Sequence, residues 1–163
     1  MSTNAAAKSR IARACVAMIS NGDAVFLDAG STVLGIAELL AHSGGHEPRP
    51  KNVNVLTNAL PVAQTIAGEA DVRHTVLGGT LRPAGECFVG LTDQGFTVAD
   101  LAEAQVKRAV IERARRAIVA MDHSKLGASD FAKVRDLGDV TAITTDYLDE
   151  LCQHAGVEII VAD

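Results

Sequence analysis

The chain has 163 residues, a mass of 17.0 kDa and a formal net charge of −5. The length is typical of one domain with a substantial core. The negative net charge argues against a sequence-independent nucleic-acid-binding protein, which normally carries a basic excess. Aromatic residues make up only 3% of the chain, so Ala, Val, Leu and Ile must form most of the core. No apolar run approaches the roughly 20 residues of a membrane helix, and Met1–Ala7 lacks the apolar segment of a signal peptide. We therefore expect a soluble cytoplasmic protein.

In the first half of the chain, short apolar runs alternate with segments whose apolar residues recur at helical spacing. Asn21-Gly22 is a helix stop signal, and Pro61 is tolerated in the first turn of a helix. The predicted elements are a helix over 5–20, a strand over 24–28, a helix over 31–42, a strand over 53–57, a helix over 58–67 and a strand over 72–77.

The second half continues this alternation after a Gly- and Pro-containing segment over 80–95. Its predicted elements are a helix over 100–116, strands over 117–121, 140–144 and 157–161, and a short helix over 147–154. Basic residues between Lys107 and Arg116 are interleaved with Glu103 and Glu112, as on a solvated helix face. Strands that alternate with helices predict an α/β fold: an open, mainly parallel sheet with helices on both faces.

Four predicted strand ends carry glycines and small polar residues. They are Asp28-Ala29-Gly30-Ser31-Thr32, Thr57-Asn58, Gly78-Gly79-Thr80 and Asp122-His123-Ser124-Lys125. In a parallel sheet these ends share one edge, outside which ligands bind. Backbone N–H groups at a helix N-terminus, hydroxyls and Lys125 favour an anion there, most simply a phosphate. The first turn matches neither a Walker loop nor Gly-x-Gly-x-x-Gly, so nucleotide binding is not indicated.

Each of these residues also has a structural interpretation. Ser31 and Asn58 are typical helix N-caps, and the Asp28 carboxylate can accept hydrogen bonds from backbone N–H groups of its own turn. Gly78-Gly79 is compatible with a tight turn, and Lys125 with an ordinary surface lysine. Because all are predicted at one sheet edge, we favour a shared ligand site.

Other chemistry is not indicated. The three cysteines are odd in number and lack metal-ligand spacing, which indicates free thiols in a reducing compartment, and no metal is expected. No Gly-x-Ser-x-Gly elbow is present. His123 is the one histidine at the predicted edge, where a ligand contact and an exposed loop position are both compatible with it.

An ordered set of segments carries a family resemblance. The segments are Phe26–Thr32, Val55–Asn58, Leu77–Arg82, Gly95–Thr97, Glu103–Arg108, Asp122–Lys125 and Ile143–Asp146. In this order they closely resemble the C-terminal effector-sensing domain of DeoR-type bacterial transcription regulators. The resemblance extends over nearly the whole chain, and the set is far more specific than any one motif.

The resemblance implies a Rossmann-like fold, similar to ribose-5-phosphate isomerase, glucosamine-6-phosphate deaminase and coenzyme A transferases. It also implies a homo-oligomer in which a phosphorylated sugar or related metabolite relieves repression when bound. We expect no cofactor. The ligand site would comprise Asp28, Gly30, Ser31, Thr32, Thr57, Asn58, Gly78, Gly79, Lys107 and Lys125. Lys107 enters only through the resemblance, and its alternative is an i, i+4 pair with Glu103 worth about 0.3–0.5 kcal/mol.

Two departures from the family pattern affect these expectations. The winged helix-turn-helix that precedes the sensor in family members is missing, so we expect DNA contact only through such a domain. Between Gly79 and Gly95 the family normally has an additional helix and strand, whereas here Gly85–Gly90 runs almost directly into Gly95. Either the segment is shortened, or the numbering runs across residues that were not observed. The unpaired backbone groups left by an excised strand favour the second, and we place no site residue between Leu81 and Gly95.

The main alternative is an enzyme of related fold, a sugar-phosphate isomerase or deaminase. It would need a carboxylate or histidine base next to the carbon that is deprotonated. Asp28 and Asp122 are candidates, but a position beside a phosphate site suits Asp28 better for binding than for catalysis. We therefore predict an effector-sensing domain with no catalytic residue.

Overall fold

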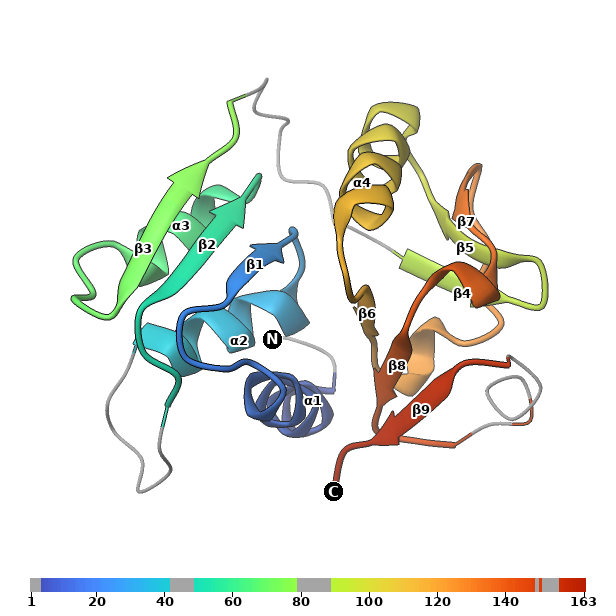
Figure 1. Cartoon of the computed structure of the whole chain (residues 1–163). Helices are drawn as coiled ribbons and strands as arrows, with labels where there is room; N and C mark the ends of the chain where they lie inside the picture. The colour runs from blue at the N-terminus through green and yellow to red at the C-terminus, as the bar shows by residue number, and fades with distance from the viewer. Residues whose placement is uncertain (1–3, 42–48, 79–88, 149, 151–155) are drawn as a thin grey trace. The chain divides into compact units, whose positions relative to one another are not determined.

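The structure is a computed structural model, and it describes residues 4–41, 49–78, 89–148, 150 and 156–163 (Figure 1). The chain divides into two compact units, unit 1 (Met1–Glu86) and unit 2 (Cys87–Asp163). Parallel sheets flanked by helices occur in the structure, so the predicted α/β class is confirmed. Within the described residues, no helix is long and apolar enough to span a membrane.

Unit 1 contains a parallel three-stranded sheet with the order β1-β2-β3. Its elements are α1 (Ala5–Ala17), β1 (Ala24–Leu27), α2 (Ser31–Ala41), β2 (Val53–Thr57), α3 (Leu60–Ile66) and β3 (Val72–Val76). Leu27 pairs with Thr57, and Thr57 pairs with Val76. The three strands therefore run in one direction and end at the same edge (Figure 1).

One face of this sheet is buried. Along β2, Val53, Val55 and Thr57 are buried whereas Asn54 is exposed, which is the alternation expected of a strand with one covered face. Figure 1 shows α2 and α3 on the same side of the sheet. The buried side chains of the helices include Ile11, Leu40, Val62 and Ile66, so aliphatic residues form this core as the composition predicts.

Arg49 fastens the segment before β2 to the end of α2. Its Nη1 donates to the carbonyl oxygens of Leu40 (2.8 Å) and Ala41 (3.2 Å). The same guanidinium lies 3.4 Å from Glu69 Oε2 and 3.4 Å from Asp71 Oδ2. The last carbonyls of a helix lack intrahelical hydrogen-bond donors and carry partial negative charge. A guanidinium supplies the missing donors and also has a favourable electrostatic interaction with this charge.

The described residues of unit 2 form two three-stranded sheets, β4-β5-β7 and β6-β8-β9. The first is antiparallel and the second parallel. The elements are β4 (Val89–Thr92), β5 (Gly95–Val98), α4 (Leu101–Arg113), β6 (Ile118–Ala120), η1 (His123–Lys125), β7 (Ala132–Arg135), η2 (Leu137–Asp139), β8 (Ala142–Thr145) and β9 (Glu158–Val161). The core side chains include Leu91, Phe96, Val98, Met121, Val134 and Ile143.

The antiparallel sheet is absent from the sequence prediction. Every residue of β5 is buried, and each strand of this sheet has only four residues, the shortest length at which alternation indicates a strand. Glycines allow close packing, because a Cβ at Gly90 or Gly95 would overlap the carbonyl oxygen of Ala128 or Arg135, respectively.

Other predicted boundaries shift by a few residues. The helix predicted over 58–67 spans Leu60–Ile66, and the one predicted over 100–116 spans Leu101–Arg113. Most of the helix predicted over 147–154 lies outside the described residues.

We predict that Arg49→Met lowers the free energy of unfolding by about 1–2 kcal/mol, because the α2 carbonyls lose a charged donor. The 3.4 Å ion pairs add little, since they are partly exposed. Urea denaturation followed by circular dichroism measures the change, with Arg115→Met, at an exposed position of unit 2, as the control. Equal midpoints for the two variants would contradict this function of Arg49.

Candidate functional site

The carboxyl edge of the unit 1 sheet brings together all the predicted ligand residues of unit 1 that the structure describes. Asp28, Gly30, Ser31 and Thr32 lie in or after the β1–α2 turn, Thr57 and Asn58 at the end of β2, and Gly78 after β3. Leu77 N donates to the Thr57 carbonyl (2.8 Å), which extends the pairing of β2 with the chain beyond β3. Gly79 lies outside the described residues.

The β1–α2 turn places a helix N-terminus at this edge. Gly30 has a φ of 137°, and its carbonyl accepts from Leu34 N (2.9 Å). Gly30 thus occupies the N-cap position, and Ser31 is the first helical residue with an exposed side chain. Asp28 Oδ1 accepts from Ala29 N (2.8 Å), so the predicted structural interpretation of Asp28 is confirmed. Thr32 is buried.

The β2–α3 turn contains one buried and one exposed polar residue. Thr57 is fully buried, and its Oγ1 accepts from Ala59 N (3.0 Å). Asn58 is exposed, and the N-cap of α3 is Ala59, so the interpretation of Asn58 as an N-cap is wrong. Gly78 is also exposed.

The two predicted lysines belong to unit 2. Lys107 Nζ lies 3.0 Å from Glu103 Oε1 within α4, and both side chains are 9% exposed. The i, i+4 pair predicted as the alternative is therefore present, but it is buried rather than solvated. Lys125 ends the 3₁₀ turn η1 and is half-buried.

Two carboxylates organise the turn after β6. Asp122 is 1% exposed, and its Oδ1 accepts from Ser124 N (3.1 Å) and Ser124 Oγ (2.5 Å). Asp146, which follows β8, accepts from His123 N (2.8 Å) and lies 2.8 Å from His123 Nδ1. Asp122 thus serves its own turn and is buried away from solvent, which argues against the catalytic base considered from the sequence. Sequence analysis included Asp146 in a family segment but did not predict it as a site residue.

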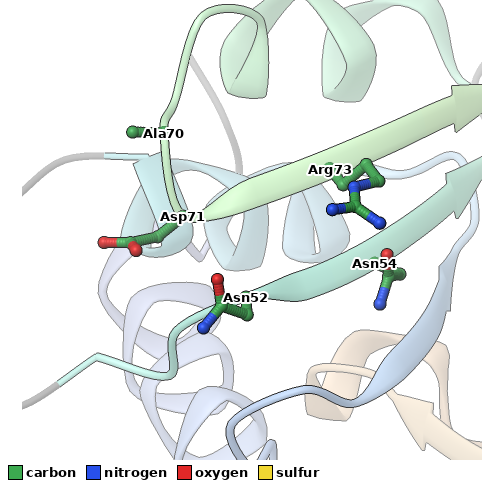
Figure 2. A pocket seen from close by; sticks show the side chains of 5 residues that line it. All are labelled: Asn52, Asn54, Ala70, Asp71 and Arg73. Carbon is green, nitrogen blue, oxygen red and sulfur yellow. The ribbon is translucent and has the colours of Figure 1, made fainter.

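The structure also contains a pocket that sequence analysis did not predict. It has a volume of about 250 Å³ and is lined by Asn52, Asn54, Ala70, Asp71 and Arg73. Figure 2 shows Asn54 and Arg73 on neighbouring strands, with Asn52, Ala70 and Asp71 near the points where those strands begin. The pocket therefore lies toward the amino ends of β2 and β3, away from the predicted ligand edge.

A metal site is not found in the described part of the chain. No group of three His, Cys, Asp or Glu side chains there has an arrangement that could hold a metal ion. The one cysteine described, Cys15, is buried on α1 and is not part of a disulfide.

Comparison with known families identifies the class of domain. The chain matches the DeoR C terminal sensor domain over residues 3–94 and 89–147. It therefore belongs to the family of DeoR C-terminal sensor domains, as its sequence predicts.

Individual relatives are transcriptional repressors. The chain is 27% identical over 182 residues to the HTH-type transcriptional repressor GlcR of Bacillus subtilis (strain 168), covering 96% of this chain and 67% of that protein. It is 30% identical over 162 residues to the glycerol-3-phosphate regulon repressor of Escherichia coli (strain K12), covering 85% of this chain and 61% of that protein. It is 28% identical over 168 residues to the lactose phosphotransferase system repressor of Staphylococcus aureus (strain N315), covering 89% of this chain and 64% of that protein.

The matches show how much of each relative the chain covers, and they also bear on the enzyme alternative. The chain spans about 61–67% of the length of these relatives. The match to the Bacillus repressor extends over 182 residues, more than the 163 of this chain, so that relative has residues without a counterpart here. All three relatives are named as repressors, and the matching family is described as a sensor domain. The comparisons give the isomerase or deaminase alternative no support.

We predict that Asp122→Ala lowers the free energy of unfolding by about 1–3 kcal/mol, because the Ser124 amide and hydroxyl lose their common acceptor. Ser124→Ala removes only the hydroxyl and has a smaller effect, about 0.5–1.5 kcal/mol. Urea denaturation measures both, with Asp93→Ala in the exposed β4–β5 turn as the control. An Asp122→Ala variant as stable as the control would show that the buried carboxylate does not hold the turn.

Proposed function

We propose that this chain is the effector-binding part of a DeoR-type regulator and binds a phosphorylated sugar or related metabolite. Binding would modulate the DNA affinity of a separate helix-turn-helix domain in a cytoplasmic homo-oligomer. The single observation that carries the effector site is the in-register parallel sheet of unit 1, which gathers Asp28, Ser31, Asn58 and Gly78 at one edge.

The groups at this edge favour an anion. The first N–H groups of a helix have no intrahelical acceptor, and the helix dipole adds partial positive charge at the same point. The exposed Ser31 hydroxyl and Asn58 amide add donors beside the N-terminus of α2 and the end of β2. Hydroxyl and amide donors are suited to phosphate oxygens and to sugar hydroxyls.

The pocket at Asn52, Asn54 and Arg73 is the competing location on unit 1. We favour the carboxyl edge because ligands of open parallel sheets bind outside the carboxyl ends of the strands. The family resemblance also lies in the turns of that edge. The participation of Gly79, Lys107 and Lys125 rests on the resemblance alone.

The relatives support the class of effector. One is named for a glycerol-3-phosphate regulon and another for a lactose phosphotransferase system, so phosphorylated polyols are the natural first probes. Regulation requires that the effector bind the two regulatory states with different affinity, because equal affinity would shift no population.

The proposal is tested by thermal denaturation with glycerol 3-phosphate, glucose 6-phosphate, fructose 6-phosphate, ribose 5-phosphate and inorganic phosphate. A cognate compound at 100 times its Kd should stabilise the fold by about 2.7 kcal/mol. Ser31→Ala should raise that Kd about tenfold, since a hydrogen bond to a charged group contributes about 1.5 kcal/mol.

Ser20→Ala is the matched control, because Ser20 is exposed and follows α1. It should leave the Kd unchanged. The proposal of a working effector site would fail if no compound of the panel stabilised the protein.

A further inference from the structure

The pocket toward the amino ends of β2 and β3 has polar walls and is not part of the proposed effector site. Asn52, Asn54 and Arg73 are exposed, and Asp71 is half-buried. The volume of about 250 Å³ is below the range of about 300–1,000 Å³ typical of pockets for drug-sized ligands. The pocket therefore has the size expected for a small metabolite.

The register of β2 and β3 brings two of the polar side chains together. Asn54 lies opposite Arg73, so both project from the same face of the sheet. Because Val53 and Val55 are the buried residues of β2, this is the face opposite the apolar core. Figure 2 shows the Arg73 side chain directed toward β2 and the Asp71 carboxylate directed away from Arg73.

The backbone that carries these side chains is held on both sides of β2. Val53 N donates to the Asp71 carbonyl (3.0 Å), and Asn54 N donates to the Asp23 carbonyl (2.8 Å). Asn52 has a φ of 55°, a left-handed conformation that asparagine adopts more readily than most residues. The polar walls are therefore in place before a ligand arrives, which lowers the entropy that binding must overcome.

The charges around the pocket leave Arg73 without a counterion among the described residues. The Arg49 guanidinium lies 3.4 Å from Glu69 Oε2 and 3.4 Å from Asp71 Oδ2, so both carboxylates are already paired. In the part of the chain that the structure describes, Arg73 makes no ion pair or hydrogen bond. Its guanidinium has five N–H donors, which can bind an anion from outside the chain.

The same groups favour a carboxylate over a phosphate. The planar fork of an arginine matches the two oxygens of a carboxylate. A phosphate monoester carries more negative charge and is repelled more strongly by Asp71, which lines the same pocket. The amides of Asn52 and Asn54 both donate and accept, so they are suited to hydroxyl groups.

We propose that this pocket binds a small hydroxycarboxylate, with Arg73 holding the carboxylate and Asn52 and Asn54 the hydroxyls. It is a second binding site of unit 1, at the opposite end of the strands from the proposed effector edge. The inference goes beyond the proposed function and does not depend on it.

Calorimetric titration with glycerate and gluconate tests the site, with glycerol and glucose as uncharged counterparts that should bind more weakly. We expect Arg73→Gln to raise the Kd of the tighter-binding acid about ten- to hundredfold, because the hydrogen bonds from a charged donor are lost. The matched control is Arg13→Gln at an exposed position of α1, which makes the same change of charge and should leave this Kd unchanged.

A second variant keeps the arginine. Asn54→Asp has nearly the same size and places a carboxylate opposite Arg73, so it should occupy the guanidinium and abolish binding of both acids. Circular dichroism checks that each variant is folded. In the unsubstituted chain, the side-chain amide NMR signals of Asn52 and Asn54 should shift when glycerate is added.

The outcomes distinguish this inference from the proposed function. Absence of binding by both acids, or an unchanged Kd in Arg73→Gln, overturns the inference alone. Equal losses in Arg73→Gln and Arg13→Gln would show a general effect of charge, which also overturns it. If Arg73→Gln instead lost affinity for a sugar phosphate, both the inference and the effector site at the carboxyl edge would be wrong. Acid binding that depends on Arg73, without any sugar-phosphate binding, supports the inference and overturns the proposed function.

Discussion

Leu27, Thr57 and Val76 lie side by side in the parallel sheet of unit 1, and the other features of the proposed effector site follow from this register. Parallel strands need a crossover between each pair, here α2 and α3. Each crossover helix begins at the carboxyl edge, so the N-terminus of α2 and the exposed turn before α3 come to the same edge. At the other end of α2, Arg49 satisfies the last carbonyls and joins them to the segment that enters β2.

Strand ends in both units combine a buried hydrogen-bond acceptor with an exposed polar side chain. At the ends of β2 and β6 a buried side-chain oxygen accepts hydrogen bonds within the turn, and a neighbouring side chain faces solvent. Thr57 accepts from Ala59 N while Asn58 is exposed. Asp122 accepts from Ser124 while His123 is exposed. The buried acceptors keep the turn backbones in place, so the exposed groups can be positioned before a ligand arrives, which lowers the entropy that binding must overcome.

Sequence reasoning succeeds where one local pattern determines the structure. The apolar runs at 24–28 and 53–57, each followed by turn residues, correspond closely to β1 and β2. It fails where partners are distant in sequence. The contact between His123 and Asp146 depends on β6 lying next to β8, and the β4-β5-β7 sheet joins strands of only four residues, of which β7 lies far from β5 in the sequence. The i, i+4 spacing predicts Glu103 as the partner of Lys107, but it does not predict that both side chains are buried.

The family pattern predicts an additional helix and strand between Gly79 and Gly95, and the Bacillus relative has residues without a counterpart in this chain. The proposed effector edge does not depend on that segment. Ser31 is placed by the β1–α2 turn and Asn58 by the β2–α3 turn, and both turns precede it in the chain. The pairing that aligns them involves only β1, β2 and β3. The arrangement of the two proposed effector-binding turns is therefore set by the part of the chain that precedes this segment.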